Sequence, residues 1–414
     1  MTTIRLHGDG AADDSRTGAR TLAEVLSGSD ERGFGGRVRG LYAHVPFCFH
    51  KCHYCDFYSF VDREGRSGAF LDRFDADVAW TGERIALGSG GAIETIFVGG
   101  GTPTLLTAEE LVRLTQSLRR LPLAHDLEWT VEANPETVDR EKAEVLAGSG
   151  VNRISIGAQS FDPKHLATLE RWHDPANVVR AAGAARAAGI DNINLDLIFG
   201  VPGQTLDEWR DDLRRALDLG PAHLSCYGLT YEPNTAMTKR LERGEFERCD
   251  DLLEAEMYDA TRETLAAAGF GQYEISNFAR VGRACRHNLV YWRNEQWWAI
   301  GPSASGFVAG HRFKVVPRLG DWLAREGGDG SPPVVDHEPP DERRHTSEAL
   351  MLGLRLMEGI DAALERRAVE LDPARAAVFA RAIAGGLLER TGEGRLRVTH
   401  RGAALANEVL AEIV

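Results

Sequence analysis

The sequence predicts an α/β fold in which helices cover a parallel sheet. Six short apolar runs alternate with longer stretches whose apolar residues recur at helical spacing. The runs are apolar at nearly every position, as strands buried on both faces are. The 414 residues, 43% of them hydrophobic and 27% charged, suffice for one large domain and a smaller one. A partial or complete (β/α) barrel suits this pattern, and a doubly wound sheet fits it equally.

The alternation begins at residue 41, and before it the sequence is of a different kind. Residues 1–38 are rich in Gly, Asp, Ser and Arg, which predicts a flexible extension with one short helix over 21–26. The core barrel is then predicted over 39–240. Its predicted strands are 41–45, 95–98, 127–132, 153–157, 192–199 and 223–229. The helices predicted between them are 69–87, 108–121, 140–147, 176–188 and 206–219.

The alternation weakens after residue 229. A helix predicted over 250–268 opens an extension of the core that spans 241–326. The Gly- and Pro-rich stretch 327–341 predicts a linker. The last part, 342–414, is expected to form a small winged-helix-like domain, because helices precede a hairpin there. Its predicted elements are helices over 346–356 and 374–384, a hairpin over 387–399 and a closing helix over 403–413.

The charge balance excludes some classes of protein. A net charge of −14 disfavours a protein that coats nucleic acid, so we expect no nucleic-acid partner. No apolar run approaches the ~20 residues of a membrane span, and the first residues lack the apolar centre of a secretion signal. A cytoplasmic location is therefore expected. One local basic cluster is interpreted as a solvated face; it comprises Arg390, Arg395, Arg397, His400 and Arg401.

Three of the six cysteines follow the first predicted strand directly. Cys48, Cys52 and Cys55 have the spacing C-x3-C-x2-C. Three thiolates on one loop can ligate three irons of a [4Fe–4S] cluster. Most electron-transfer clusters use four cysteines, so three leave one iron open to a substrate or cofactor. The alternatives are a structural zinc ion, with a nearby histidine (His44, His50 or His53) as fourth ligand, and unmodified cysteines that cluster by chance.

A strand followed by this spacing, with an aromatic residue before the last cysteine, resembles the radical S-adenosylmethionine (SAM) superfamily. Residues 42–57, YAHVPFCFHKCHYCDF, are similar to the oxygen-independent coproporphyrinogen III oxidase-like (HemN/HemW) family. The segment is closer to the haem chaperones of that family than to its oxidases, because Phe57 stands where the oxidases carry a fourth cysteine. The resemblance covers about residues 40–414. It implies a partial (β/α)6 TIM-like barrel whose strand ends hold the cluster and SAM.

The resemblance also implies which residues bind SAM. Glu132 would pair with the ammonium group, Arg171 with the carboxylate and Asp196 with the ribose hydroxyls. The glycines after the second strand would admit the methionine moiety close to the backbone. Taken singly, the same residues fit a tight turn, satisfied polar groups at strand ends and a surface cation. The full set is Tyr42, Tyr54, Gly100, Gly101, Thr102, Glu132, Gln159, Arg171 and Asp196.

A second segment resembles a haem-chaperone motif. Residues 285–292, CRHNLVYW, contain His-Asn-x-x-Tyr-Trp. Imidazole is a common axial ligand of haem iron, so His287 is a candidate ligand, and Tyr291 and Trp292 are candidates to pack against the porphyrin. The alternative is an aromatic core patch around a hydrogen-bonded histidine. Many chains of this kind carry a second histidine in the following Gly-rich loop, but here Ser305 occupies that position.

We therefore expect a radical-SAM-type haem chaperone. It would bind a [4Fe–4S] cluster, SAM and haem, receive electrons from a donor, and deliver haem to haemoproteins such as respiratory enzymes. The alternatives are a coproporphyrinogen III oxidase, which oxidatively decarboxylates propionates, and a radical SAM methylase of the same family. Phe57 disfavours the oxidase, and enzymatic activity as such stays an open question. A homodimer and peripheral contact with the inner face of the cytoplasmic membrane also stay open.

Overall fold

Six parallel strands form the centre of the structure, a computed structural model that describes residues 20–27, 37–87, 91–324 and 330–413. These strands stand in the sheet in the order in which they occur in the sequence. A doubly wound sheet reverses its order at one point, so the consecutive order confirms the predicted partial (β/α)6 barrel. The strands are β2 (Val38–Val45), β3 (Ile93–Gly100), β4 (Leu123–Ala133), β5 (Arg153–Gln159), β6 (Asn192–Phe199) and β7 (His223–Gly228).

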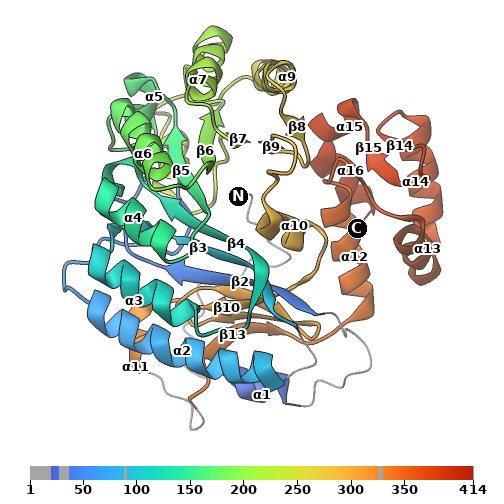
Figure 1. Cartoon of the computed structure of the whole chain (residues 1–414). Helices are drawn as coiled ribbons and strands as arrows, with labels where there is room; N and C mark the ends of the chain where they lie inside the picture. Colours follow the sequence, from blue (N-terminus) through green and yellow to red (C-terminus); the bar gives the residue numbers. More distant parts are fainter. Residues whose placement is uncertain (1–19, 28–36, 88–90, 325–329, 414) are drawn as a thin grey trace.

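Helices connect consecutive strands and cover the outer face of the barrel (Figure 1). Capping residues define where several of them begin. Thr107 and Thr205 each accept a hydrogen bond from the third helical amide. The carboxylate of the glutamate at that position in turn accepts one from the amide of the threonine. The helices are α2 (Ser67–Leu87), α3 (Ala108–Leu118), α4 (Arg140–Gly148), α5 (Pro163–Thr168), α6 (Pro175–Ala187) and α7 (Leu206–Asp218).

The sheet continues beyond the barrel strands on both sides. Next to β2 it adds β10 (Gln296–Ile300), which is parallel, and then β11 (Ser305–Val308), β12 (His311–Val315) and β13 (Pro333–Glu338), which are antiparallel. Next to β7 it adds antiparallel β9 (Asn277–Ala279) and β8 (Gly271–Gln272). The predicted linker over 327–341 was therefore wrong in part. A strand forms because Pro333 stands at its first position, where proline is tolerated, and Val334 is buried in the core.

The first described residues also belong to the barrel and not to a flexible extension. β1 (Arg20–Thr21) pairs with β13, and α1 (Leu22–Leu26) buries Leu22 and Val25 in the main core. Thr21 and Glu24 form a capping box, which accounts for the short helix predicted over 21–26. Apart from 20–27 and 37–38, the predicted extension lies outside the described residues.

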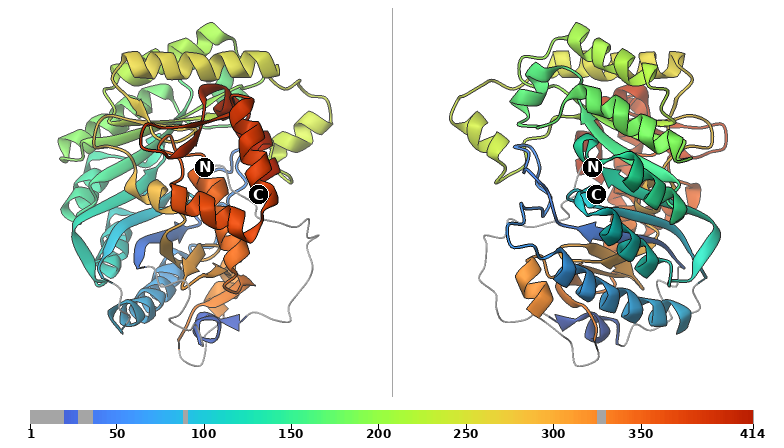
Figure 2. Two further views of the ribbon diagram at one scale, coloured as in Figure 1. Left: turned by 90° about the vertical axis from the view of Figure 1, so that its right-hand side faces the viewer. Right: turned by 60° about the vertical axis from the view of Figure 1, so that its left-hand side comes forward.

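Four further helices lie around the barrel. α8 (Ala236–Glu242) stands beside the loop after β2, where the amide of Met237 donates to the carbonyl of His53 at 2.9 Å (Figure 2). α9 (Asp251–Ala267) packs on α7 and matches the helix predicted over 250–268. α10 (Arg286–Trp292) contacts β2, β3 and β10, and α11 (Leu319–Ala324) contacts α2.

A second, smaller core lies beside the barrel (Figure 2). Its helix over 374–384 and its hairpin were predicted, whereas the helix over 362–371 was missed because only Ala368 of that helix is buried. The elements are α12 (Glu342–Gly353), α13 (Ala362–Leu371), α14 (Ala374–Ala384), β14 (Leu388–Arg390), β15 (Leu396–Val398), α15 (His400–Ala404) and α16 (Ala406–Ile413). No helix in the described ranges is long and apolar enough to cross a membrane.

Candidate cluster and SAM site

A cleft of about 270 Å³ opens where the barrel strands end, which is where barrels of this kind carry their sites. The loop after β2 lines it together with the ends of β3, β4 and β5 and the inner faces of β6 and β7. Of the residues predicted for cluster and SAM, the structure brings all but Tyr42 to this cleft. They are Cys48, Cys52, Tyr54, Cys55, Gly100, Gly101, Thr102, Glu132, Gln159, Arg171 and Asp196.

The cysteine loop is held in place by backbone hydrogen bonds. The amide of Cys48 donates to the carbonyl of Phe60 at 3.0 Å, and the amide of Cys55 donates to the carbonyl of Cys52 at 3.2 Å. The sulfur of Cys48 lies 3.5 Å from the hydroxyl of Thr102, and Arg171 Nη1 donates to the sulfur of Cys52 at 3.5 Å. Burial raises the pKa of Cys48, and it raises the pKa of Cys55 to about 11.

The spacing of the thiols argues against a single zinc ion. A tetrahedral zinc ion holds sulfur at about 2.3 Å, which brings its ligand atoms within about 4 Å of one another. Among the described residues, three ligand atoms of His, Cys, Asp or Glu lie within 4.8 Å of one another only at Asp162, His165 and Glu208, outside the cleft. The three thiols therefore offer the donor chemistry of a [4Fe–4S] group without the close spacing that a single zinc ion requires.

The histidines near the cysteines are committed to other partners. His44 Nε2 is 2.8 Å from the carbonyl oxygen of Tyr58, and His44 Nδ1 is 3.1 Å from the hydroxyl of Tyr42. Burial lowers the pKa of His44 to about 4. His50 Nε2 is 3.1 Å from the carbonyl oxygen of Glu170, and its ring stacks on Trp172 at 3.9 Å. His44 therefore has both ring nitrogens occupied and His50 has one, while the third candidate, His53, has Nδ1 3.2 Å from Arg240 Nη1.

The glycines after β3 are required by the packing of the strand ends. Gly100 has φ 103°, and a Cβ atom there would lie 2.3 Å from the ring of His44. A Cβ on Gly101 would lie 2.6 Å from the carbonyl oxygen of Phe47. The amides of Gly101 and Thr102 donate to the carbonyls of Val45 and Phe47. These amides thus bind the cysteine loop to β3, whereas the sequence led us to expect them at the methionine moiety.

The two carboxylates predicted to bind SAM line the cleft and differ in how their oxygens are paired. Glu132 accepts a hydrogen bond from the amide of Gly100 at 3.0 Å, and burial with repulsion from Asp196 raises the pKa of Glu132 to about 7. Asp196 accepts hydrogen bonds from Ser155 at 2.9 Å and Asn194 at 2.8 Å. Asp196 is therefore already paired, as the alternative interpretation of a satisfied strand residue requires. Glu132 would be stabilised as a carboxylate by a nearby cation such as an ammonium group.

Arg171 and Gln159 retain unused hydrogen-bonding capacity. Arg171 Nη2 donates to the carbonyl of Gly157 at 3.0 Å, while Arg171 Nε and Gln159 Oε1 are buried without a partner. Gln159 holds φ 55°, a left-handed conformation that few residues other than glycine adopt. Buried polar atoms in proteins are nearly always paired. These two atoms therefore fit a polar ligand such as the methionine part of SAM.

The two tyrosines predicted for the SAM site are placed differently. Tyr54 lines the cleft. Burial, followed by the proximity of the Cys52 thiol, raises the pKa of Tyr54 well above its usual value. Tyr42 lies outside the cleft lining. Its hydroxyl contacts His44, and its ring stacks on Phe97, which does line the cleft.

The haem candidates stand on α10, near the N-terminal halves of β2 and β3. His287 is fully buried, with Nδ1 2.8 Å from the hydroxyl of Thr95 and Nε2 2.8 Å from the hydroxyl of Tyr291. Burial and the charge of Arg153 lower the pKa of His287 to about 3. The structure thus shows the hydrogen-bonded core histidine of the alternative interpretation, with both ring nitrogens occupied. Trp292 is half-buried and is not part of the cleft lining.

Several polar residues on the inner face of the barrel were not predicted from the sequence. On β5 every second side chain lines the cleft, beginning at Arg153, while those between pack outward in the core. The alternation has a period of two residues, but the strand as a whole is apolar, and this conceals the alternation in the sequence. The residues missed include Arg153, Ser155, Asn194, Ser225, Tyr227 and Asn288.

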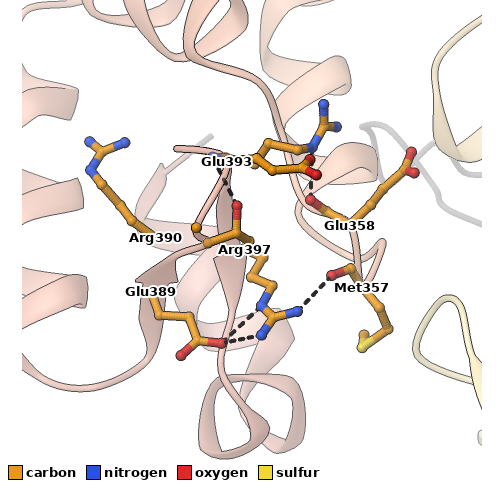
Figure 3. A pocket seen from close by; sticks show the side chains of 9 residues that line it. Met357, Glu358, Glu389, Arg390, Glu393 and Arg397 are labelled. Atoms are coloured by element: carbon orange, nitrogen blue, oxygen red, sulfur yellow. Dashed lines mark hydrogen bonds and ion pairs between the residues drawn. The ribbon is translucent and has the colours of Figure 1, made fainter.

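A separate pocket of about 490 Å³ lies in the C-terminal domain (Figure 3). It contains part of the predicted basic cluster. Arg397 forms an ion pair with Glu389 at 2.7 Å, Arg390 pairs with Glu365 at 2.7 Å, and Arg395 donates to the carbonyl of Glu358 at 2.9 Å. These three arginines are committed to partners of the same domain, and the pocket lies apart from the cysteine cleft.

Comparisons with known proteins agree with this geometry. A family model described as the radical SAM superfamily matches residues 42–216, and one described as the HemN C-terminal domain matches residues 341–405. The chain is 35% identical to the heme chaperone HemW of Bacillus subtilis, over 90% of this chain and 98% of that one. It is 36% identical to the heme chaperone HemW of Mycobacterium tuberculosis (strain H37Rv), over 92% of this chain and 95% of that one.

Among solved structures, the coproporphyrinogen III oxidase HemN of Escherichia coli aligns with a TM-score of 0.79 at 20% identity. The alignment covers 95% of this chain and 93% of that one, so the two share the whole fold. The sequence similarity to the heme chaperones extends through both domains. The chain belongs to the radical SAM superfamily and, within it, to the HemW family.

Proposed function

We propose that this chain is a haem chaperone of the radical SAM type. It holds a [4Fe–4S] cluster and SAM in the cleft, takes up haem, and passes haem to haemoproteins such as respiratory enzymes. One observation carries the proposal: three cysteine thiols share a buried cleft with Arg171 and Gln159, in a chain that aligns with 98% of a heme chaperone HemW.

The residues of the cleft divide the binding work. Cys48, Cys52 and Cys55 would hold three irons and leave the fourth for SAM, and the bound pair would supply one-electron chemistry. Arg171 offers Nε to the SAM carboxylate. Glu132 has one carboxylate oxygen on the Gly100 amide and a second for the SAM ammonium. The ribose hydroxyls would join the existing hydrogen bonds of Asp196 with Ser155 and Asn194.

The proposal extends to the partners and the place of action. An electron donor reduces the cluster, the haem acceptors are respiratory haemoproteins, and the chain acts in the cytoplasm. Of the predicted domain limits, the one at residue 341 is retained as the proposed boundary between the barrel and the C-terminal domain.

The test is an anaerobic haem titration of the reconstituted chain, followed by transfer of the bound haem to an acceptor apoprotein. We expect saturable binding of one haem per chain and transfer faster than release into buffer. Cys52→Ala should abolish cluster absorbance, whereas Cys249→Ala, outside the cleft, should leave it intact. One zinc per chain with no iron or sulfide would overturn the assignment of the cysteines.

The same preparation tests the oxidase alternative. Coproporphyrinogen is added with SAM and a reductant, and the products are separated. Protoporphyrinogen formed over many turnovers would replace the chaperone proposal by an enzyme. Methylated product together with S-adenosylhomocysteine would replace it by a methylase.

A further inference from the structure

A buried arginine stands at the deep end of the cleft, on the first residue of β5. Arg153 is 1% exposed and lines the cleft together with Ser155, Gly157 and Gln159, the alternate residues of the same strand. Six residues of strand separate Arg153 from Gln159, or about 20 Å. Arg153 therefore stands at the opposite end of β5 from Gln159, while its side chain lines the same cleft.

Arg153 has no direct partner for its charge. Its Nε is buried without a hydrogen bond, and in the part of the chain that the structure describes no carboxylate forms an ion pair with it. Glu128 and Asp196 are the two carboxylates that attract Arg153 electrostatically, and both do so without contact. A buried cation without a paired anion is costly.

Both nearby acids are used elsewhere. Glu128 accepts hydrogen bonds from the amides of Arg286 and His287, each at 3.1 Å, and so anchors α10. Asp196 accepts from Ser155 and Asn194. Both carboxylates thus accept hydrogen bonds from other groups, and neither contacts the guanidinium. The donors of Arg153 remain available to a ligand that enters the cleft.

We propose that Arg153 binds a carboxylate of a ligand that lies along the barrel interior. A guanidinium matches a carboxylate with two parallel hydrogen bonds. Asn288 of α10 lines the same cleft and offers a neutral donor, and Phe97 and Tyr227 line it with aromatic rings. The chemistry suits the acid-bearing edge of an aromatic ligand.

This inference rests on the proposed function, under which the ligand is haem and the carboxylate is a propionate. It also assigns the segment 285–292 a different part from the one its sequence suggested. Asn288 reaches the cleft from α10, whereas His287 on the same helix is turned to Thr95 and Tyr291. The other source of a carboxylate is SAM, for which Arg171 at the mouth is the assigned partner.

The experiment compares haem with haem dimethyl ester, in which both propionates are esterified. Both are titrated anaerobically into the reconstituted wild type, Arg153→Gln, Arg153→Lys and the control Arg214→Gln, which removes an exposed arginine of α7. We expect the wild type and the control to bind haem at least tenfold more tightly than the ester. Arg153→Gln should lose that preference, and Arg153→Lys should retain part of it. SAM affinity should be unchanged in both Arg153 variants.

Each contrary result has a distinct meaning. A wild type that binds haem and ester equally would overturn the inference while leaving the proposed function standing, whatever the folding of the variants. Retained preference in Arg153→Gln with weakened SAM binding would assign the guanidinium to SAM and overturn the propionate. A wild type that binds neither porphyrin would remove the proposed function, and the inference with it.

Discussion

At the scale of single residues, buried polar atoms differ in whether they have hydrogen-bond partners. Core groups such as Asp212 are fully engaged: its two oxygens accept from the hydroxyl of Ser160 and the amide of Phe161. In the cleft, Arg171 and Gln159 keep buried atoms without partners. Buried polar atoms in proteins are usually paired, so a polar ligand in the cleft would complete the hydrogen bonds of these two residues.

The first prediction concerns Arg171. Arg171→Ala should weaken SAM binding by about 1.5–3 kcal/mol, the range for a hydrogen bond to a charged group. Calorimetry of SAM binding to the reconstituted chain measures the effect. Arg140→Ala, which removes an exposed arginine of α4, serves as the control. Equal affinity for SAM in Arg171→Ala and the wild type would remove this residue from the site.

The second prediction concerns His287. Its replacement by alanine leaves a cavity and deprives the hydroxyls of Thr95 and Tyr291 of their partner, so the free energy of unfolding should fall by about 2–4 kcal/mol. Chemical denaturation of His287→Ala beside the exposed control His125→Ala measures this. The visible spectrum of the haem complex should show the same iron ligation in His287→Ala as in the wild type. Altered ligation at unchanged stability would restore His287 as an axial ligand.

At the scale of elements, α10 is attached to the barrel by one distant carboxylate. Glu128 of β4 is 7% exposed and accepts hydrogen bonds from the first two amides of α10, which lie about 160 residues further along the chain. The first amides of a helix have no partner within the helix itself. Glu128 therefore does for α10 what a capping residue does locally for other helices, and it closes the barrel on that side.

The third prediction follows from this attachment. Glu128→Ala should lower the free energy of unfolding by about 2–4 kcal/mol, because two buried amides lose their acceptor. Hydrogen exchange at the amides of Arg286 and His287 should accelerate more than exchange in α7. The control is Glu109→Ala, an exposed residue in the first turn of α3. Unchanged exchange at α10 would show that packing alone holds this helix.

Elements of the barrel could be predicted from the sequence to a different degree from those beyond it. Residues 192–199 are apolar enough to match β6 to the residue, and the helices that follow strands carry clear capping signals. The strands β10 to β13 were not predicted because their signal is divided. Residues 291–298 read as one aromatic stretch, although Tyr291 and Trp292 end a helix and Trp297 and Trp298 lie in a strand. A strand whose pairing partner lies far away in the sequence carries no local signal of that pairing.

The candidate site could be predicted where a motif carries it and not where the barrel assembles it. Cys48, Cys52 and Cys55 are close in sequence, and a family pattern identifies Arg171 and Glu132. Arg153 and Asn288 reach the same cleft from β5 and α10, and only the assembled fold brings them together. Conversely, the motif at 285–292 suggested a ligand in His287, whose ring nitrogens proved to be occupied.

At the scale of the whole molecule, buried histidines make stability depend on pH. Burial, followed by the charge of Arg153, lowers the pKa of His287 to about 3 and that of His223 well below 6.5. Below pH 6.5 the unfolded chain takes up protons at these residues that the folded chain excludes. The contribution of these two histidines to the free energy of unfolding is therefore fully present above about pH 6.5, and it falls as the pH decreases toward the folded pKa values.

The fourth prediction gives this effect a size. Each of the two histidines should contribute about 1.4 kcal/mol of lost stability per pH unit between pH 6 and 5. Urea denaturation at several pH values measures the slope in the wild type and in His287→Gln, whose slope should be smaller by one histidine. The exposed control His125→Gln should keep the wild-type slope. A slope in His287→Gln equal to that of the wild type would contradict the neutral state of the His287 ring.

The pairing of β1 with β13 has a consequence for how the chain is made. Arg20 contacts His337, which lies 317 residues later. A ribosome adds about 5–20 residues per second, so the first strand waits roughly 15–60 s for its neighbour to be synthesised. Until β10 is synthesised, the edge of β2 that later receives it is uncovered, and an uncovered strand edge invites pairing with other chains. Cellular folding factors that shield nascent chains would act in this interval.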